Sequence, residues 1–187
     1  MPEIRLVGVG DAVQIAAIYD AVVLESVASF ELDPPGPEEM ASRIAKVTAT
    51  HPWVVMVEDE QVLGYAYATT HRDRSAYRFV AETTIYMGPG HRGLGLGKSL
   101  YRALLQLTTL WGYSSAYAGI TVPNPGSEAL HAAVGFEKVG VFPRAGFKQD
   151  RWHDVSWWSR TLDPADHPNE PGSPSPDVVS RALSDLD

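Results

Sequence analysis

Hydrophobic and polar positions along the chain follow two different periods, and each period predicts a different element. Apolar residues recur at the three- and four-residue spacing of an amphipathic helix over residues 11–25, 37–47, 98–111 and 126–134. Apolar runs rich in β-branched and aromatic residues predict strands over residues 4–9, 52–58, 61–70, 78–87, 113–122, 136–142 and 151–162. Because the strands come in runs with helices inserted, the pattern favours an α+β domain around a mixed, mostly antiparallel twisted sheet flanked by helices.

Two local features refine this outline. Asp11 followed three residues later by Gln14 predicts a capping box at the start of the first helix. The last strand holds three of the five tryptophans. Alternation places Trp152 and Trp158 on one face of that strand and Trp157 on the other, so both faces need cover, either from the core or from a partner.

Composition divides the chain into a domain and a tail. A chain of 187 residues is long enough for one domain with a proper core, which we place at residues 1–162. Residues 163–187 hold five of the 14 prolines, six acids and one base, a net charge of −5 that leaves −3 of the total −8 for the domain. We expect this acidic, proline-rich tail to be disordered or loosely packed.

Charge, cysteine content and hydropathy exclude several classes of protein. Neither part has the basic face that nucleic-acid binding needs. The absence of cysteine removes disulfides, thiolate metal sites and a cysteine acyl-enzyme, and the histidines show no metal-binding spacing, so no metal is expected. No apolar run approaches the roughly 20 residues that span a bilayer, and the start "MPEIRLVGVGD" does not resemble a secretory signal. We therefore expect a cytoplasmic protein with no membrane partner.

The loop between residues 87 and 98 carries the strongest functional signal. Its stretch "GPGHRG" matches the dinucleotide fingerprint, but the helix begins too late and the first acid that follows is Glu128, too distant to bind a ribose. The stretch "GKS" resembles the end of a P-loop, but Arg92 stands where a P-loop needs glycine. Both nucleotide-binding motifs are therefore excluded by spacing.

What remains is an Arg92-x-x-Gly95-x-Gly97 loop that opens a long helix. Unobstructed backbone N–H groups and the positive end of the helix dipole together attract a pyrophosphate, and Arg92 and Lys98 add charge at the rim. The alternative is an ordinary glycine-rich surface turn. The position between a strand and a strongly patterned helix favours ligand binding.

This loop resembles the acetyl-coenzyme A pyrophosphate loop of the GNAT superfamily of N-acetyltransferases. The motifs "SFE", "PWVV", "GYAYA", "RSAY", "AETTIYM", "HRGLGLGKSLY", "VPN", "LHAAVGF", "AGFK" and "WHDVSWW" occur in the order seen in the phosphinothricin acetyltransferase family, whose members confer bialaphos or methionine sulfoximine resistance. The resemblance spans residues 4–162. It implies a GNAT fold, acetyl-CoA as co-substrate and a homodimer.

Two residues are candidates for proton transfer. Glu82 is the only charged residue in "FVAETTIYM" and lies on the strand that leads into the glycine loop, where a partly buried carboxylate serves as a general base for the amine. The alternative is an acid on the solvent face of a strand. The resemblance assigns catalysis to a glutamate at this place. His131 is the second candidate, since the family has a histidine here with a proposed acid/base role, whereas the residue alone is equally consistent with packing.

The resemblance also implies binding residues for both substrates. Backbone groups and side chains that would contact acetyl-CoA are Ile85, Tyr86, Met87, Arg92, Gly93, Leu94, Gly95, Leu96, Gly97, Lys98 and Asn124. Asn124 alone is also explained as a turn residue before Pro125. Residues expected at the acceptor are Phe30, Arg72, Arg74, Tyr77 and Glu82, because arginine pairs with carboxylate or phosphinate oxygens. "DAVV" and "TVPN" depart from the family's usual residues, so the acceptor is open to change.

The sequence thus predicts an N-acetyltransferase that moves acetyl to the α-amine of a small anionic amino-acid analogue such as phosphinothricin, methionine sulfoximine or methionine sulfone. Direct attack is expected, with both substrates held together and no acyl-enzyme. Two alternatives stay open: a GNAT enzyme for another amine, such as a polyamine or a peptide N-terminus, and a non-catalytic acyl-CoA-binding sensor. Intact Glu82 and His131 argue against the sensor.

Overall fold

One seven-stranded sheet organises the computed structural model, which describes residues 2–163, 165 and 168–184. The strand order is β1-β2-β3-β4-β5-β7-β6. The strands are β1 (Glu3–Leu6), β2 (Trp53–Glu58), β3 (Gln61–Thr70), β4 (Val80–Met87), β5 (Ser115–Val122), β6 (Glu137–Lys148) and β7 (Arg151–Thr161). The helices are α1 (Ala12–Glu25), α2 (Gly36–Thr48), α3 (Leu96–Leu110), α4 (Pro125–Ala133) and α5 (Pro176–Ser184). Short 3₁₀ turns, η1 (Val9–Asp11) and η2 (Ser75–Tyr77), precede α1 and β4.

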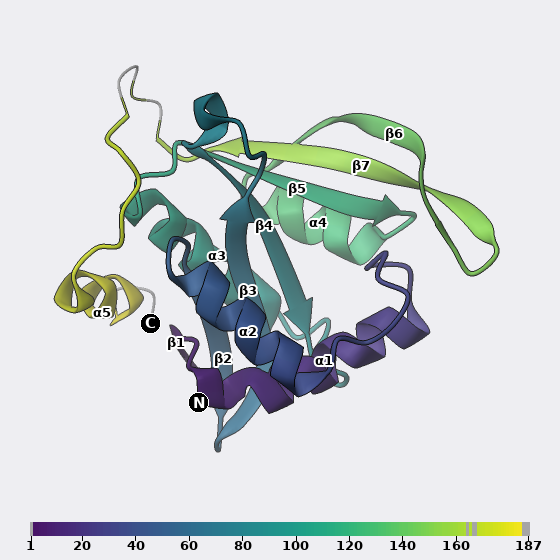
Figure 1. The fold of residues 1–187 in the computed structure, drawn as a ribbon, viewed down its shortest axis with the longest axis horizontal. Helices are drawn as coiled ribbons and strands as arrows, with labels where there is room; N and C mark the ends of the chain where they lie inside the picture. Colours follow the sequence, from purple (N-terminus) through teal and green to yellow (C-terminus); the bar gives the residue numbers. More distant parts are fainter. Residues whose placement is uncertain (1, 164, 166–167, 185–187) are drawn as a thin grey trace.

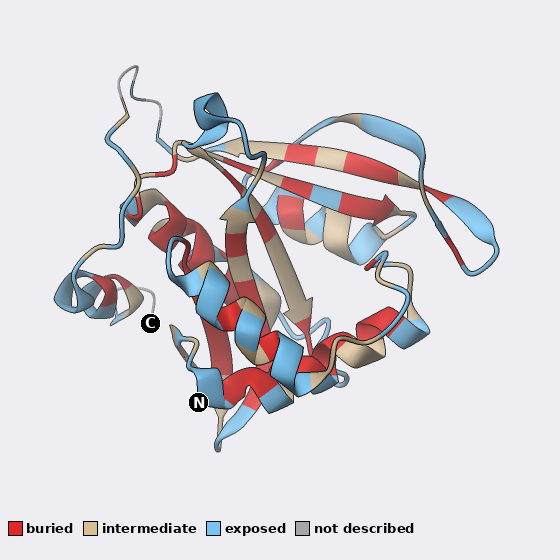
Figure 2. Ribbon diagram, in the orientation of Figure 1, coloured by how far each residue is buried: buried red, intermediate tan, exposed pale blue. Residues whose placement is uncertain are grey.

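Helices cover both faces of the sheet, with α1 and α2 in front and α3 behind (Figure 1). Strand alternation explains the two cores. On β3, Tyr65 belongs to the apolar cluster under α1 and α2, whereas Ala66 and Ala68 belong to the cluster under α3. Small alanines let α3 approach the sheet closely, while tyrosine fills the wider space on the other side. Figure 2 shows this burial as red along β2, β3 and α3, with pale blue on the outer surfaces of α1 and α2.

The sheet opens between its two central strands. Every recorded strand pair is antiparallel except β4 with β5, which are parallel and pair only over Val80–Glu82 with Ser115–Tyr117. Beyond Glu82 the recorded pairing ends and the two strands diverge toward the end of β4 (Figure 1). The expected α+β architecture with a mixed, mostly antiparallel sheet is confirmed.

The β6–β7 hairpin extends well beyond the rest of the sheet and is longer on the β6 side than the sequence pattern indicated (Figure 1). Lys148 at the end of β6 is buried, and its Nζ donates hydrogen bonds to the backbone oxygens of Val23 (2.7 Å) and Ser29 (2.8 Å). These bonds tie the hairpin to the end of α1 and to the loop that follows it. The hairpin thereby closes one side of the opening between β4 and β5.

The start of α1 differs from the predicted capping box. Asp11 makes no side-chain cap to the helix; its carboxylate accepts hydrogen bonds from Arg5 Nη1 and Nη2, both 2.8 Å long, and from the Gly8 N–H. Gln14 reaches across to the β2–β3 turn, where it accepts from the Val62 N–H and donates to the Glu60 carbonyl. The carboxylate of Asp11 is thus engaged by residues that precede the helix, and Gln14 by a turn that is distant in sequence, so neither side chain forms the predicted cap.

Part of the tail is packed against the domain, in contrast to the expectation of disorder or loose packing. Helix α5 buries Val179 and Ala182 in the cluster under α3, and Gln106 of α3 donates a hydrogen bond to the Ala182 carbonyl. Upstream, the Gly172 N–H donates to the Trp111 carbonyl. The composition of the tail indicated low hydrophobicity overall, but two apolar residues three positions apart on one helix face suffice for docking. Residues 164, 166–167 and 185–187 of the tail lie outside the described residues.

Candidate active site

A cleft of about 570 Å³ fills the opening between β4 and β5. Its walls are the end of α1, the second half of β4, the glycine loop, the start of α3, the end of β5 and α4. A separate hollow of about 420 Å³ lies between α2 and strands β2 and β3, and neither the glycine loop nor α4 contributes to it. We place the candidate site in the cleft because it combines a glycine loop, a helix N-terminus and an unpaired strand edge.

The glycine loop adopts a conformation that few other residues tolerate. Gly90, Gly93 and Gly95 have φ angles of 84°, 77° and 83°, in the left-handed region. Gly95 is the N-cap of α3, so the helix begins at Leu96 and directs its first-turn N–H groups at the cleft. A Cβ added at Gly93 or Gly95 would meet no atom within 4 Å, which means that both face open space. The geometry suits a pyrophosphate at the helix N-terminus.

Two cations border this loop. Arg92 and Lys98 both line the cleft. The Arg92 Nε donates a hydrogen bond of 3.2 Å to the Met87 carbonyl, which fixes the guanidinium stem against the end of β4. Leu94 is exposed on the loop. Of the loop residues predicted to bind the coenzyme, Leu94 and Leu96 do not line the cleft, whereas Arg92, Gly93, Gly95, Gly97 and Lys98 do.

The second half of β4 presents a backbone edge to the cleft. Ile85, Tyr86 and Met87 pair with β3 on one side, through Ala66, Tyr65 and Gly64 respectively. On the other side no pairing with β5 is recorded beyond Glu82. Backbone polar groups on this edge are thus open to a ligand lying along the strand.

Asn124 lies at the start of α4 and lines the cleft. Its Oδ1 accepts a hydrogen bond of 3.2 Å from the Ser127 N–H, so it caps the helix. The turn role that the sequence offered as an alternative is therefore present. This capping role is compatible with contact to a ligand, since Asn124 also lines the cleft.

Glu82 sits where the paired part of β4 ends. It is aligned with Thr69 of β3 on one side and Tyr117 of β5 on the other, and its side chain is 35% exposed. Its Oε2 lies 3.2 Å from Nδ1 of His71, the first residue after β3. Sequence analysis did not single out His71. No local signal pointed to it, because its position depends on the register of β3 against β4: with Thr69 opposite Glu82, a residue two positions on lies diagonally across the same face.

His131 occupies a different environment from Glu82. It is buried, its Nδ1 lies 2.7 Å from the Ser127 carbonyl, and its Nε2 lies 3.0 Å from the Tyr101 hydroxyl. That hydroxyl also lies 2.8 Å from Thr83 Oγ1. Because side chains alternate along β4, Thr83 and Glu82 point to opposite faces of the sheet. The two residues predicted for proton transfer are therefore separated by the strand, although His131 borders the cleft.

Burial lowers the pKa of His131, and its hydrogen bond to the Ser127 carbonyl opposes this effect. Burial also raises the pKa of Tyr101 far above its ordinary value, so the phenol stays protonated. Only a protonated Nδ1 can donate to the Ser127 carbonyl, which leaves Nε2 to accept from Tyr101. The hydrogen bonds thus describe a neutral imidazole with both nitrogens engaged.

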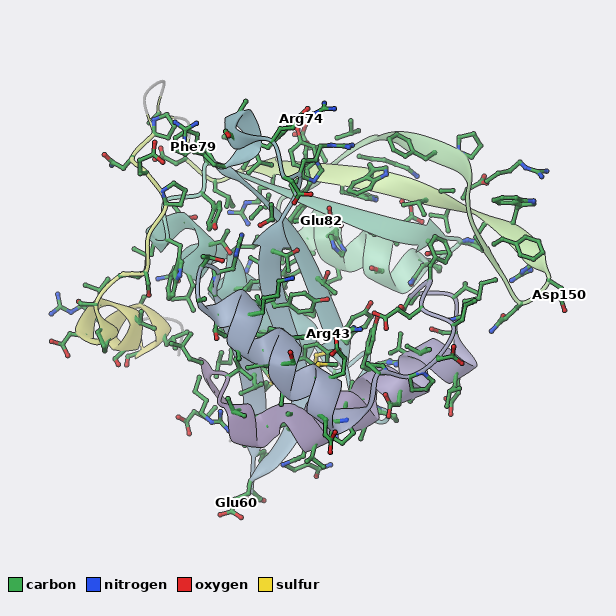
Figure 3. The ribbon with its side chains drawn as sticks, viewed as in Figure 1. Arg43, Glu60, Arg74, Phe79, Glu82 and Asp150 are labelled. Carbon is green, nitrogen blue, oxygen red and sulfur yellow. The ribbon has the colours of Figure 1, made fainter. Side chains whose placement is uncertain are left out.

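The residues predicted for the acceptor come from two segments. Arg72, Arg74 and Tyr77 lie in the β3–β4 connection. Figure 3 shows Arg74 above the start of β4, near Glu82. Tyr77 approaches this end through His71, with ring centroids 6.0 Å apart. Phe30 lies between α1 and α2, and its ring packs on Gly146 and His153 of the hairpin. Tyr77 therefore lies near Glu82 through His71, whereas Phe30 packs on the hairpin. The cleft is lined by none of the predicted acceptor residues.

Comparison with known proteins decides the family. The family model described as "Acetyltransferase (GNAT) family" matches residues 16–136, from α1 through α4. The chain belongs to the GNAT acetyltransferase family. Its sheet, opened between β4 and β5 and flanked by helices, is the GNAT fold, as the motifs implied. The protein is an acetyl-CoA-dependent N-acetyltransferase.

Individual relatives and solved structures show which acetyltransferases this chain is similar to. Phosphinothricin N-acetyltransferase of Alcaligenes faecalis is 40% identical over 165 residues, covering 87% of this chain and 84% of the relative. L-Methionine sulfoximine/L-methionine sulfone acetyltransferase of Salmonella typhimurium is 30% identical over 161 residues, covering 86% and 94%. The crystal structure of a phosphinothricin acetyltransferase from Sinorhizobium meliloti with acetyl-CoA is 38% identical, covers 94% of this chain and 96% of that one, and superposes with a TM-score of 0.86.

The cleft of this GNAT enzyme fits acetyl-CoA on its own features. Gly93 and Gly95 leave open space beside the α3 N-terminus, where a pyrophosphate needs close backbone approach. The unpaired edge of β4 offers backbone partners to an extended pantetheine arm. Within residues 2–163, 165 and 168–184, no group of three or more histidine, aspartate or glutamate side chains is arranged to hold a metal ion. In the same part of the chain no helix is both long and apolar enough to cross a membrane.

Proposed function

We propose that this GNAT enzyme acetylates the α-amine of a small anionic amino-acid analogue of the phosphinothricin, methionine sulfoximine or methionine sulfone type. The observation that carries the proposal is the position of Glu82: a half-exposed carboxylate at the point where β4 and β5 separate, with one oxygen held by His71. The names of the relatives support the acceptor class.

Glu82 serves as the general base in this proposal. A free α-amine is mostly protonated at neutral pH, and it must lose a proton before its nitrogen attacks. Glu82 takes that proton, and the nitrogen lone pair forms a bond to the acetyl carbonyl carbon. Collapse of the tetrahedral intermediate breaks the C–S bond, and the second nitrogen proton leaves with the thiolate. The products are the N-acetylated acceptor, coenzyme A as the thiol, and one proton that Glu82 releases to solvent.

The chain supplies the remaining groups without a covalent intermediate. The backbone groups of Ile85, Tyr86 and Met87 that face the cleft polarise the thioester carbonyl and hold the pantetheine arm. The pyrophosphate lies against the segment from Arg92 to Lys98, and Asn124 contacts the coenzyme from the other wall of the cleft. Holding both substrates in one opening converts the transfer into an effectively unimolecular step.

The acceptor lies on the Glu82 side of the opening. Arg72 and Arg74 pair with its carboxylate or phosphinate oxygens, while Tyr77 and Phe30 border its carbon skeleton. The residues "DAVV" at 20–23 and "TVPN" at 121–124 depart from the usual family pattern, and Val22, Thr121 and Asn124 line the cleft. These departures make the acceptor's side chain the part most open to variation.

His131 supports β4 from behind. With both ring nitrogens engaged by Ser127 and Tyr101, it holds the Tyr101 hydroxyl against Thr83, the residue next to Glu82. Its contribution to proton transfer is therefore smaller than that of Glu82.

We also propose a homodimer, because the hairpin leaves Val139, Val141 and Phe142 exposed along one strand.

A turnover assay tests the proposal directly. The protein is mixed with acetyl-CoA and a panel of amines, and free thiol is followed with a thiol-reactive dye. We expect turnover with phosphinothricin, methionine sulfoximine or methionine sulfone, and none with spermidine or with a peptide N-terminus. Turnover restricted to a polyamine or a peptide favours the second enzyme function, and acetyl-CoA binding without turnover on any amine favours a sensor.

A further inference from the structure

The imidazole of His71 lies against the carboxylate of Glu82, and the two come from different strands. His71 Nδ1 is 3.2 Å from Glu82 Oε2. The first follows β3, and the second lies on β4 two positions diagonally across the same face. A catalytic role for this contact rests on the proposed role of Glu82 as the base.

Aromatic neighbours fix the orientation of the His71 ring. It stacks on Tyr117 of β5 with centroids 4.9 Å apart and planes 20° apart. Tyr77 and Trp157 meet it edge-on, each with centroids 6.0 Å away. The side chain is only 11% exposed, against 35% for Glu82. The ring is therefore held on three sides, while the carboxylate beside it remains open to a ligand.

The polarity of the contact follows from the chemistry of the two groups. An ionised carboxylate only accepts hydrogen bonds, so Nδ1 carries the hydrogen and donates it to Oε2. We propose that His71 is a positioning residue: it fixes Oε2 of Glu82 and thereby aims Oε1 at the amine. The ring also turns the carboxylate away from other rotamers that a half-exposed glutamate would sample.

The charged and titratable groups around the contact are few. Tyr117 and Tyr77 contribute phenols from β5 and η2, and Trp157 contributes no titratable group from β7. On the loop of His71 itself, Arg72, Asp73 and Arg74 are all exposed. The hydrogen bond from His71 is the interaction that sets the direction of the carboxylate, because no arginine or lysine forms a recorded ion pair with Glu82 in the described residues.

Two substitutions separate the hydrogen bond from the packing. His71→Phe keeps an aromatic ring for Tyr117 but removes the donor, and His71→Asn keeps an N–H near the place of Nδ1 but removes the ring. A misaimed catalytic group costs roughly 10- to 100-fold in rate, and we expect that loss of kcat in His71→Phe with a KM for acetyl-CoA within twofold of wild type. His71→Asn should retain more activity than His71→Phe. His51→Phe is the matched control, since His51 is also buried and stacks on a tyrosine, Tyr113, at 5.0 Å.

Chemical rescue tests the donor itself. His71→Gly removes the ring and leaves room for a small imidazole. We expect 4-methylimidazole, which carries an N–H, to restore part of kcat in a saturable way. The assay is run at alkaline pH, where imidazoles are unprotonated; there the isomer 1-methylimidazole has the same size but no N–H, and should restore none. Acetylated acceptor is measured by mass spectrometry, with an enzyme-free blank because imidazoles react with thioesters. If His71→Gly does not fold, the comparison of His71→Phe with His71→Asn decides alone.

The outcomes distinguish this inference from the proposed function. If Glu82→Gln is inactive while His71→Phe turns over like wild type, His71 does not position Glu82 and only the inference fails. Equal rescue by both methylimidazoles would also overturn it, because donation would then be irrelevant. If Glu82→Gln itself turns over like wild type, the general base is wrong and the inference falls with it.

Discussion

Tyr101 and His131 form a buried hydrogen bond of 3.0 Å between the phenol oxygen and Nε2. The bond continues on both sides, to Thr83 at 2.8 Å and to the Ser127 carbonyl at 2.7 Å. It links α3, α4 and β4 through one continuous set of polar groups inside the core. Burial favours the neutral imidazole, whose Nδ1 donates to the Ser127 carbonyl while Nε2 accepts from the Tyr101 phenol.

The first prediction concerns acid stability. Burial lowers the folded-state pKa of His131 below its unfolded value of about 6.5. The unfolded chain then binds more protons in the window below that value, so the free energy of unfolding falls as pH drops from 6.5 through the folded pKa. His131→Asn should lose less stability than wild type between pH 7.5 and 5.5 in urea titrations. Burial also lowers the pKa of His51, so His51→Asn is the companion variant with the same expected sign. Parallel pH curves for wild type and His131→Asn would contradict the assignment.

The second prediction concerns Glu82. Glu82→Gln keeps the shape and hydrogen-bonding capacity but cannot take a proton, so kcat should fall by about 10²–10⁴-fold, the usual contribution of a positioned base. Affinity for acetyl-CoA should barely change. The deficit should shrink as pH rises toward the pKa of the acceptor amine, because more of the amine is then already neutral.

Glu60→Gln provides the control for that measurement. Glu60 is exposed on the β2–β3 turn, at the opposite end of the molecule from Glu82 (Figure 3). It should turn over like wild type. A structural role for Glu82 predicts a different outcome: a lower melting temperature and a loss of rate that does not depend on pH.

The third prediction concerns the glycine loop. Gly95→Val places a branched side chain in the open space beside the α3 N-terminus, where the pyrophosphate is proposed to lie. We expect at least tenfold weaker acetyl-CoA binding in calorimetry, worth about 1.4 kcal/mol. Gly90→Val is the matched control, because Gly90 has nearly the same φ, also faces open space and does not line the cleft. Equal affinities for the two variants, both folded, would remove the loop from the binding site.

The fourth prediction concerns helix α5. Val179 is 5% exposed in the cluster under α3, whereas its neighbour Val178 is 42% exposed. Val179→Ala removes two buried side-chain carbon atoms and should lower the free energy of unfolding by about 1.5 kcal/mol. Val178→Ala should change it by less than about 0.5 kcal/mol. Chemical denaturation measures both, and equal small effects would mean that α5 does not dock in solution.

The fifth prediction concerns assembly. Trp158 is buried in the core, whereas Trp152 is exposed near the hairpin tip and packs on Phe147. We expect a dimer in sedimentation, weakened by Phe142→Ser on the exposed strand and unaffected by Val13→Ser on the exposed face of α1. A single species near the 20.4 kDa chain mass at micromolar concentration counts against the dimer.

The elements and the glycine loop were predictable from the sequence because their signals are local. The periodicity of residues 98–111 follows from the geometry of one helix, and only glycine adopts the left-handed backbone at Gly93 and Gly95 without a steric cost. The spacing of Arg92, Gly95 and Gly97 therefore predicts a ligand-binding loop from local sequence alone.

Tertiary structure decided the features that depend on pairing between distant segments. The hydrogen bond between His71 and Glu82 requires the register of β3 against β4, and the cleft requires that β5 stop pairing with β4 after Glu82. The partners of Gln14 and the docking of α5 belong to the same class. Such contacts join groups that only folding brings together. The local sequence around each of these residues therefore predicts its partner weakly or wrongly. Sequence alone thus predicted the helices and strands up to residue 162, apart from the full length of β6, whereas folding decided the docking of α5 and which side chains meet.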